Sequence, residues 1–246
     1  MRAWPGTASV SLASLLLLAL SLAVARAAEP IAIWTMEAYD GDVIKDATGH
    51  GHDATVHTKS GAKPKLVPGL KGMCLELDAA DEPYLEAPDA PDLDPTEGFT
   101  AMAWIKPKER GVAYEILCKR GDPNKKEEPG PGWRFRYGWS RVILDMGDNR
   151  ERLSASTADW SVPPDFWTHV AVTFDGKSAV RFYLNAVLDS EQQVAGTFVP
   201  LKRPLIIANY IGRKNAYAFH GWLDDVKLFQ GVLSQQEIFE QARLPQ

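Results

Sequence analysis

From Ile31 onward the chain is a succession of short β-branched and aromatic runs, each bounded by Gly, Pro, Asn or Asp. Typical runs are "FTAMAWIKP" at 99–107, "THVAVTF" at 168–174 and "VRFYLNA" at 180–186. Such runs predict strands, and the seventeen prolines and nineteen glycines scattered between them leave no room for a long helix. In "TAMAWIKP" and "RVILDM" the apolar residues are nearly continuous, which is typical of strands covered on both sides. We therefore expect an all-β domain.

The C-terminal segment "LSQQEIFEQA", residues 233–242, carries the one helix signal. Ser234 with Glu237 three residues later forms the capping-box pattern, and Leu233 before the cap can contact Ile238 as a hydrophobic staple. We expect a short helix that covers part of the domain and has no role in function.

The N-terminal residues 1–27 have the composition of a signal peptide. Arg2 is followed by the apolar run "SLASLLLLALSLAVA" and by "ARA" at 25–27, the small-x-small pattern that precedes signal-peptide cleavage. An uncleaved anchor is the alternative. No later segment is long and apolar enough to span a bilayer. We expect a secreted or periplasmic protein with a single domain over residues 28–246, a length that all-β sandwiches often reach as one domain.

The formal net charge of the chain is −5. Removal of Arg2 and Arg26 with the signal segment changes it from −5 to −7. Nucleic acids and anionic membrane surfaces attract positive charge, so neither is an expected partner.

Two cysteines, Cys74 and Cys118, remain in the mature chain. In an oxidising compartment they could form a disulfide, but the sequence does not show that they are close. The alternative is that both are small buried hydrophobic residues.

Five segments follow one another along the chain: "AIWTMEAYDGDVIKDATGHGHDATV", "GLKGMCLELDAADEPYLEAP", "FTAMAWIKP", "FWTHVAVTFDGKSAVRFYLNA" and "FHGWLDDVKLFQGVLSQQEI". In this order they resemble the LamG-like, concanavalin A-like jelly-roll domains of bacterial secreted proteins. The resemblance covers residues 31 to 241 and implies two antiparallel sheets packed face to face, the jelly roll used by lectins. One departure is "LNA" at 184–186, where the family usually has Asn-Gly, so the type of that turn is open.

The resemblance also implies a structural calcium ion. Ca²⁺ takes six to eight oxygen ligands, and members of the family hold one between an early loop and the last strand. Carried over, this names Asp46 and Asp224, with Glu37 and the carbonyl of His50 as further ligands. The alternative is that Asp46 makes an Asx-type turn and Asp224 accepts a hydrogen bond from a backbone amide.

The sequence gives little support to two kinds of catalytic site, a zinc centre and a glycosidase site. His50 and His52, with His57 beyond, could suggest zinc, but they alternate with glycines in an expected loop. A retaining glycosidase needs two carboxylates about 5 to 5.5 Å apart, which strands supply as alternating acidic residues. Only Glu76 and Asp78 come near that pattern, and a third carboxylate is missing.

The run "WRFRYGW", residues 133–139, alternates aromatic residues with arginines. The four aromatic residues are expected on one strand face, where core is favoured over a sugar-binding surface. Arg134 and Arg136 would then face solvent as ligand contacts. The candidate ligand-binding residues are Arg134, Arg136 and Trp139.

Two classes of function remain. The first is a secreted, non-catalytic recognition module that binds an extracellular glycan or protein. The second is a polysaccharide-acting enzyme with an unrecognised site. The lack of paired carboxylates favours the first.

Overall fold

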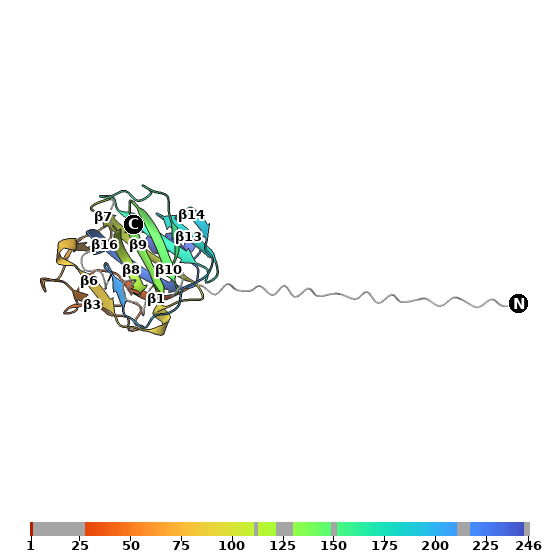
Figure 1. The fold of residues 1–246 in the computed structure, drawn as a ribbon, viewed down its shortest axis with the longest axis horizontal. Coiled ribbons are helices and arrows are strands. Elements are labelled where there is room, and N and C mark those ends of the chain that lie inside the picture. The colour runs from red at the N-terminus through yellow and green to blue at the C-terminus, as the bar shows by residue number, and fades with distance from the viewer. Residues whose placement is uncertain (2–27, 111–112, 122–129, 149–151, 211–216, 244–246) are drawn as a thin grey trace.

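The computed structural model describes residues 1, 28–110, 113–121, 130–148, 152–210 and 217–243 (Figure 1). The expected signal peptide, apart from Met1, lies outside the described residues. Within the described ranges, no helix has the length and hydropathy needed to cross a membrane.

Two antiparallel sheets form the domain, as expected. In the first sheet the strand order is β14-β13-β12-β7-β16-β5-β4, and β1 also pairs with β16. Its strands are β1 (Glu29–Trp34), β4 (Lys65–Pro68), β5 (Met73–Leu77), β7 (Phe99–Pro107), β12 (Thr168–Phe174), β13 (Ala179–Leu184), β14 (Val187–Gln193) and β16 (Gly221–Gln230).

In the second sheet the order is β11-β10-β9-β8-β15-β6-β3-β2. Strands β9 and β10 cross the front of the molecule in Figure 1. The strands are β2 (Val43–Ile44), β3 (Ala54–His57), β6 (Tyr84–Ala87), β8 (Ala113–Arg120), β9 (Gly132–Gly138), β10 (Arg141–Gly147), β11 (Arg152–Ser156) and β15 (Leu205–Ile207). Two 3₁₀ turns, η1 (Ala79–Asp81) and η2 (Pro91–Leu93), and one helix, α1 (Gln235–Ala242), complete the described elements.

The core between the two sheets is rich in aromatic rings. Strand β9 contributes Trp133, Phe135 and Tyr137, all completely buried, so these three rings are core as favoured from the sequence. Phe99 of the first sheet packs against Trp133 with ring centroids 4.9 Å apart. Burial of such large rings is the main contribution to the stability of a sandwich of this kind.

Helix α1 has the predicted cap and packs on the other face of the first sheet. Ser234 Oγ accepts from the Glu237 amide at 3.2 Å, and Glu237 Oε2 accepts from the Ser234 amide at 2.7 Å. Ile238 lies in one cluster with Met102 and Leu233, which explains why the apolar run of β7 is continuous. Residues on both faces of β7 are covered, one face by the core and the other by the helix.

The β13–β14 hairpin keeps a two-residue turn although it lacks the usual glycine. Asn185 and Ala186 both have positive φ, 49° and 63°. Two positive values are the pattern of a type I′ turn, whose twist matches that of the flanking strands. Alanine therefore adopts the left-handed conformation here at a cost of about 1 kcal/mol.

The possible disulfide is not formed, since Cys74 and Cys118 are free and buried. Cys74 lies on β5 of the first sheet next to inward-facing Leu75, and Cys118 lies on the outer face of the second sheet with Ile206. Packed sheets lie about 10 Å apart, whereas a disulfide joins Cα atoms less than about 7 Å apart.

Candidate ligand-binding site

The outer face of the second sheet carries a buried ionic network along β9. Asp145 of β10 lies opposite Arg134 and accepts from Arg134 Nε and Arg136 Nε, both at 2.8 Å. Arg152 of β11 adds a third contact, with Nη2 2.9 Å from the same carboxylate. Arg134 Nη1 also lies 2.9 Å from Glu115 Oε1 of β8. Three arginines and two carboxylates thus cross four neighbouring strands.

A β-bulge in β8 gives Glu115 its place in this network. The register with β9 shifts between Glu115 and Leu117, so Ile116 and Leu117 are both in the core. Glu115 and Cys118, three residues apart, therefore both face outward. The outward position brings Glu115 beside the arginines of β9.

Burial and the neighbouring arginines shift the pKa values of Glu115 and Asp145 in opposite directions. Burial raises the pKa of Glu115 to about 7, because the nearby guanidiniums only partly offset the loss of solvent. Asp145 is also desolvated, but Arg134 and Arg136 hold its pKa well below the ordinary range.

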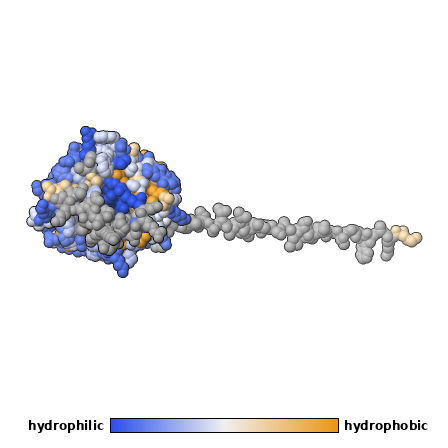
Figure 2. Space-filling view, viewed as in Figure 1, coloured by the Kyte–Doolittle hydropathy of each residue, from blue (hydrophilic) through white to orange (hydrophobic). Residues whose placement is uncertain are grey.

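Arg134 and Arg136 were expected to face solvent, and this expectation is wrong. They point away from the core, yet only 7% of Arg134 and 5% of Arg136 is exposed. Their guanidiniums are bound to Asp145 and Glu115 instead of projecting from the surface. Figure 2 shows strongly hydrophilic surface in the middle of the face that β9 and β10 cross in Figure 1.

Next to this network lies a cleft between two exposed tryptophans, which we call the tryptophan cleft. Its volume is about 350 Å³, and it is lined by Arg110, Trp139, Ser140, Asp159 and Trp160. Trp139 is 51% exposed and Trp160 is 62% exposed. Trp139 was expected in the same face as the core rings of β9, but the strand ends at Gly138 and Trp139 lies in the following turn. Large exposed aromatic surfaces on a soluble domain mark binding sites.

Three residues of the tryptophan cleft have left-handed backbone conformations. The φ angles are 55° for Trp139, 56° for Ser140 and 70° for Trp160. Trp139 and Ser140 are the two central residues of the β9–β10 turn, where Asn-Gly is the favoured pair. A bulky aromatic residue at positive φ is an outlier, and such strain, about 1 to 3 kcal/mol per residue, is concentrated at functional sites.

Charged groups hold the walls of the tryptophan cleft in place. Arg141 Nη1 lies 2.8 Å from Asp159 Oδ1, and the Arg110 guanidinium lies 4.7 Å from the ring centroid of Trp160. Arg136 approaches the Trp139 ring at 5.8 Å, which connects the cleft to the ionic network. The Ser140 carbonyl accepts from the Val162 amide at 2.8 Å and joins the two loops.

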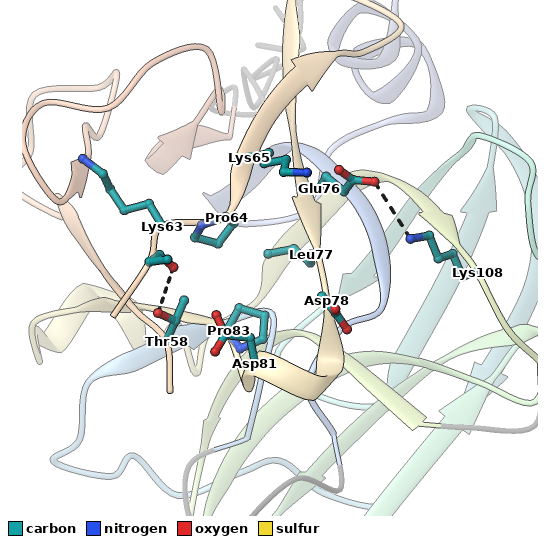
Figure 3. Close-up of a pocket in the computed structure, with 11 residues that line it drawn as sticks. Thr58, Lys63, Pro64, Lys65, Glu76, Leu77, Asp78, Asp81, Pro83 and Lys108 are labelled. Carbon is teal, nitrogen blue, oxygen red and sulfur yellow. Dashed lines mark hydrogen bonds and ion pairs between the residues drawn. The ribbon is translucent and has the colours of Figure 1, made fainter. Parts of the chain in front are cut away.

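A larger cavity of about 470 Å³ lies elsewhere, between β5, η1 and the end of β7 (Figure 3). It contains Glu76 and Asp78, the pair closest to a glycosidase pattern. Lys108 Nζ lies 3.9 Å from Glu76 Oε1, and His220 Nδ1 lies 3.6 Å from Asp78 Oδ1. No aromatic ring lines this cavity among the described residues. It therefore lacks a stacking surface of the kind that Trp139 and Trp160 provide.

Comparison with known proteins gives the family. The family described as the Concanavalin A-like lectin/glucanases superfamily matches residues 79–239, or 161 of the 246 residues. The chain belongs to this superfamily.

Solved structures share the fold of this superfamily member at low sequence identity. Domain 4 of AbnA, an extracellular GH43 arabinanase from Geobacillus stearothermophilus whose structure holds arabinotriose, is 19% identical with a TM-score of 0.67. That match covers 88% of this chain and 100% of that one. The binding domain of Paraclostridial Mosquitocidal Protein 1 is 16% identical with a TM-score of 0.65, covering 87% of this chain and 52% of that one.

Among curated proteins, mouse (Mus musculus) Pappalysin-1 is 23% identical over 155 residues, which covers 58% of this chain and 10% of Pappalysin-1. The matched part of this chain thus corresponds to about a tenth of the length of Pappalysin-1 and to about half the length of the mosquitocidal binding domain.

Asp46, named as a calcium ligand, has the hydrogen bonds of an Asx-type turn. Its carboxylate accepts from the amides of Ile33 at 3.1 Å, Thr48 at 3.0 Å and His52 at 3.3 Å. The Thr48 hydroxyl adds contacts to both oxygens. Burial alone would raise the pKa of Asp46, but these donors together outweigh it and leave the pKa below its ordinary value. Both carboxylate oxygens of Asp46 therefore accept hydrogen bonds from the loop.

The other expected calcium ligands, Asp224, Glu37 and His50, each have hydrogen-bond partners of their own. Asp224 accepts from the Asp225 amide at 2.7 Å, and Glu37 accepts from the Met73 amide at 2.9 Å. Burial, followed by the charges of Asp225 and Glu37, raises the pKa of Asp224 to about 7. His50 contributes its ring Nδ1 near the Ile31 carbonyl, at 3.1 Å.

The calcium site implied by the resemblance stays a prediction, because it would also use backbone carbonyls and water. In the described part of the chain no group of three or more His, Cys, Asp or Glu side chains is arranged to hold a metal ion. The three histidines considered for zinc also have separate partners, since His52 Nε2 lies 2.9 Å from Asp92 and His57 stacks on Tyr84.

Proposed function

We propose that this protein is an extracellular glycan-binding module whose binding site is the tryptophan cleft. The observation that carries the proposal is the pair of half-exposed tryptophans, Trp139 and Trp160, each held at positive φ beside a cavity of about 350 Å³. The shared fold with an arabinanase domain that holds arabinotriose supports a glycan as the ligand class. The signal-like residues 1–27 support secretion.

The chemistry of the cleft suits a sugar ring. The face of a sugar ring is lined by C–H groups and can pack on an indole face, while its hydroxyls need hydrogen-bond partners in the plane. Asp159 can accept from hydroxyls, and Arg110 can donate to ring and hydroxyl oxygens. The ion pair between Arg141 and Asp159 holds that carboxylate in one orientation, which lowers the entropic cost of binding.

Binding of oligosaccharides by titration calorimetry, guided by a glycan array, tests this proposal. Trp139→Ala and Trp160→Ala should each weaken binding by about 30-fold or more, the loss expected for a hot-spot tryptophan. Phe239→Ala is the matched control, because Phe239 is a half-exposed ring on α1, packed on the other sheet. Equal affinity in the tryptophan variants and the parent protein would overturn the proposal.

A polysaccharide-acting enzyme is the second candidate, favoured by the carboxyls of Glu115 and Asp145. A raised pKa on one acid and a lowered pKa on its neighbour is the arrangement of a general acid and a nucleophile. Against this, both side chains are completely buried and Glu115 Oε1 is occupied by Arg134. Hydrolysis of a polysaccharide panel that is lost in Glu115→Gln would establish the enzyme and replace the binding proposal.

A further inference from the structure

A second cavity opens on the outer face of the second sheet, on the Arg134 side of the ionic network. Its volume is about 220 Å³, and we call it the Arg120 cavity. Arg134 connects it to the network, since its guanidinium lies 5.6 Å from the ring centroid of Tyr210. The lining residues are Cys118, Arg120, Arg203, Pro204, Ile206 and Tyr210.

Guanidiniums outnumber carboxyls in the ionic network beside the Arg120 cavity. Arg134, Arg136 and Arg152 all contact Asp145, and Arg134 also contacts Glu115. Arg120 adds a fourth guanidinium to the same cluster. Four positive groups therefore face two carboxyls among the described residues of the cluster, and the carboxyl of Glu115 is easily protonated because burial raises its pKa to about 7.

Arg120 is the group whose charge is least compensated. Only 8% of the residue is exposed, and its Nε has no hydrogen-bond partner within the described residues. No described carboxylate lies within ion-pair distance of it. Burial, and then the charge of Arg134, lower the pKa of Arg120. A buried guanidinium nitrogen without an acceptor is costly unless an acceptor arrives from outside.

The remaining walls of the cavity are rigid and mostly apolar. Ile206 and Cys118 pair across β15 and β8 and are almost fully buried. Tyr210 donates its hydroxyl to the Gly121 carbonyl, which fixes its ring. The volume is below the range of about 300–1,000 Å³ of pockets that enclose a whole drug-sized ligand. One charged substituent with part of its ring therefore suits the space better than an entire oligosaccharide.

We propose that the Arg120 cavity binds the carboxylate of a uronic acid residue, so that the glycan ligand of this protein is acidic. The inference rests on the proposed function and deepens it, because it names the class of glycan. A guanidinium matches a planar carboxylate with two parallel hydrogen bonds. Arg134 and Arg136 lie between this cavity and the tryptophan cleft. Arg134 contacts the ring of Tyr210 in the cavity, and Arg136 contacts the ring of Trp139 in the cleft. One chain of sugars can then contact both sites.

The test compares oligogalacturonate, oligoglucuronate and oligomannuronate with their fully methyl-esterified forms, which keep the sugar chain and replace each carboxylate with a neutral ester. Titration calorimetry on the full mature chain should give an affinity at least about tenfold higher for one acid than for its ester. That preference should decrease with added salt. Sulfated, uronate-free oligosaccharides form a separate arm and should bind no better than neutral ones.

Variants identify the residue responsible. Arg120→Gln should remove the preference for the acid while leaving the affinity for the ester unchanged. Arg181→Gln is the control, because Arg181 forms an exposed ion pair with Glu191 on the other sheet and should leave the preference intact. The ester comparison uses the unchanged protein, so it remains decisive if Arg120→Gln fails to fold.

The outcomes separate the two proposals. Equal binding of acid and ester, weakened by Trp139→Ala, would overturn the acidic-glycan inference and leave the tryptophan cleft standing. An affinity for the acid that falls in Arg120→Gln but is unchanged in Trp139→Ala would support the Arg120 cavity and overturn the cleft as the binding site. A preference for sulfated sugars alone, or a preference retained in Arg120→Gln, would overturn the inference.

Discussion

Replacement of Glu115 by glutamine should change how stability depends on pH. Burial raises the pKa of Glu115 from 4.5 to about 7 in the folded protein. The folded state therefore holds its proton more tightly than the unfolded chain, and stability falls as the pH rises between these two values. The interval from 4.5 to about 7 corresponds to about 3 kcal/mol, at about 1.36 kcal/mol per pH unit. A glutamine side chain can still accept from Arg134 but cannot ionise, so this loss disappears.

Urea unfolding at pH 4.5 and pH 8 measures the effect. Relative to the parent protein, Glu115→Gln should gain up to about 3 kcal/mol of unfolding free energy between the two pH values, with an unchanged m value. The gain is an upper bound, because the unfolded chain need not be fully extended or free of charge interactions.

The control is Glu191→Gln, which removes a carboxylate from an exposed pair with Arg181 and should leave the pH profile unchanged. If the difference between Glu115→Gln and the parent protein were the same at both pH values, the pKa of Glu115 would be the same in the folded and unfolded states. The guanidiniums would then fully offset burial, and the raised pKa of Glu115 would be refuted.

Two further predictions concern buried polar groups. Asp46→Ala leaves the amides of Ile33, Thr48 and His52 without their acceptor and should lower the free energy of unfolding by about 2 to 4 kcal/mol. The resulting drop in Tm should be equal in calcium and in chelator. A drop in Tm seen only with calcium present would instead support the calcium site. Lys119→Met should cost about 3 to 5 kcal/mol in urea unfolding, because the buried Lys119 ammonium is paired with Asp94 and the Leu201 carbonyl and its removal leaves Asp94 unpaired. A loss below about 1 kcal/mol would mean that solvent reaches Asp94.

Local sequence signals were sufficient for the all-β class and the terminal helix, while the two-sheet jelly roll followed from the resemblance to the family. The alternation of β9 places Trp133, Phe135 and Tyr137 inward, and the capping box at Ser234 begins the helix where expected. These features depend on residues close in sequence, so pattern and propensity determine them. The two-residue turn at Asn185 also persisted, because the pairing of β13 with β14 outweighs the strain at Ala186.

The candidate site depended on long-range geometry that no local pattern carries. Trp139 continues the period of the core rings, yet the strand ends one residue earlier and the following turn directs its ring outward. Trp160 reaches the same cleft from a loop about twenty residues later along the chain. Strict alternation would place Glu115 and Cys118 on opposite faces, and only the β-bulge in β8 places them together. Bulges and strand register are set by tertiary packing, so these contacts followed from the structure alone.

The small contribution that a buried ionic network makes to stability favours a role in ligand recognition. A buried cluster of arginines and carboxylates is a weak source of stability, since apolar residues of similar size often stabilise a fold as well or better. A network that contributed only stability would therefore give no reason for an excess of positive charge or for an unpartnered Arg120 Nε among the described residues. An incoming carboxylate would supply the missing acceptor and negative charge, and the rigid pairs around Arg134 would hold the cavity in shape before binding. On this reasoning Arg134 and Arg136 position the site, while Trp139, Trp160 and Arg120 contact the ligand. The contrast between uronate and its methyl ester then measures directly whether the uncompensated charge serves recognition.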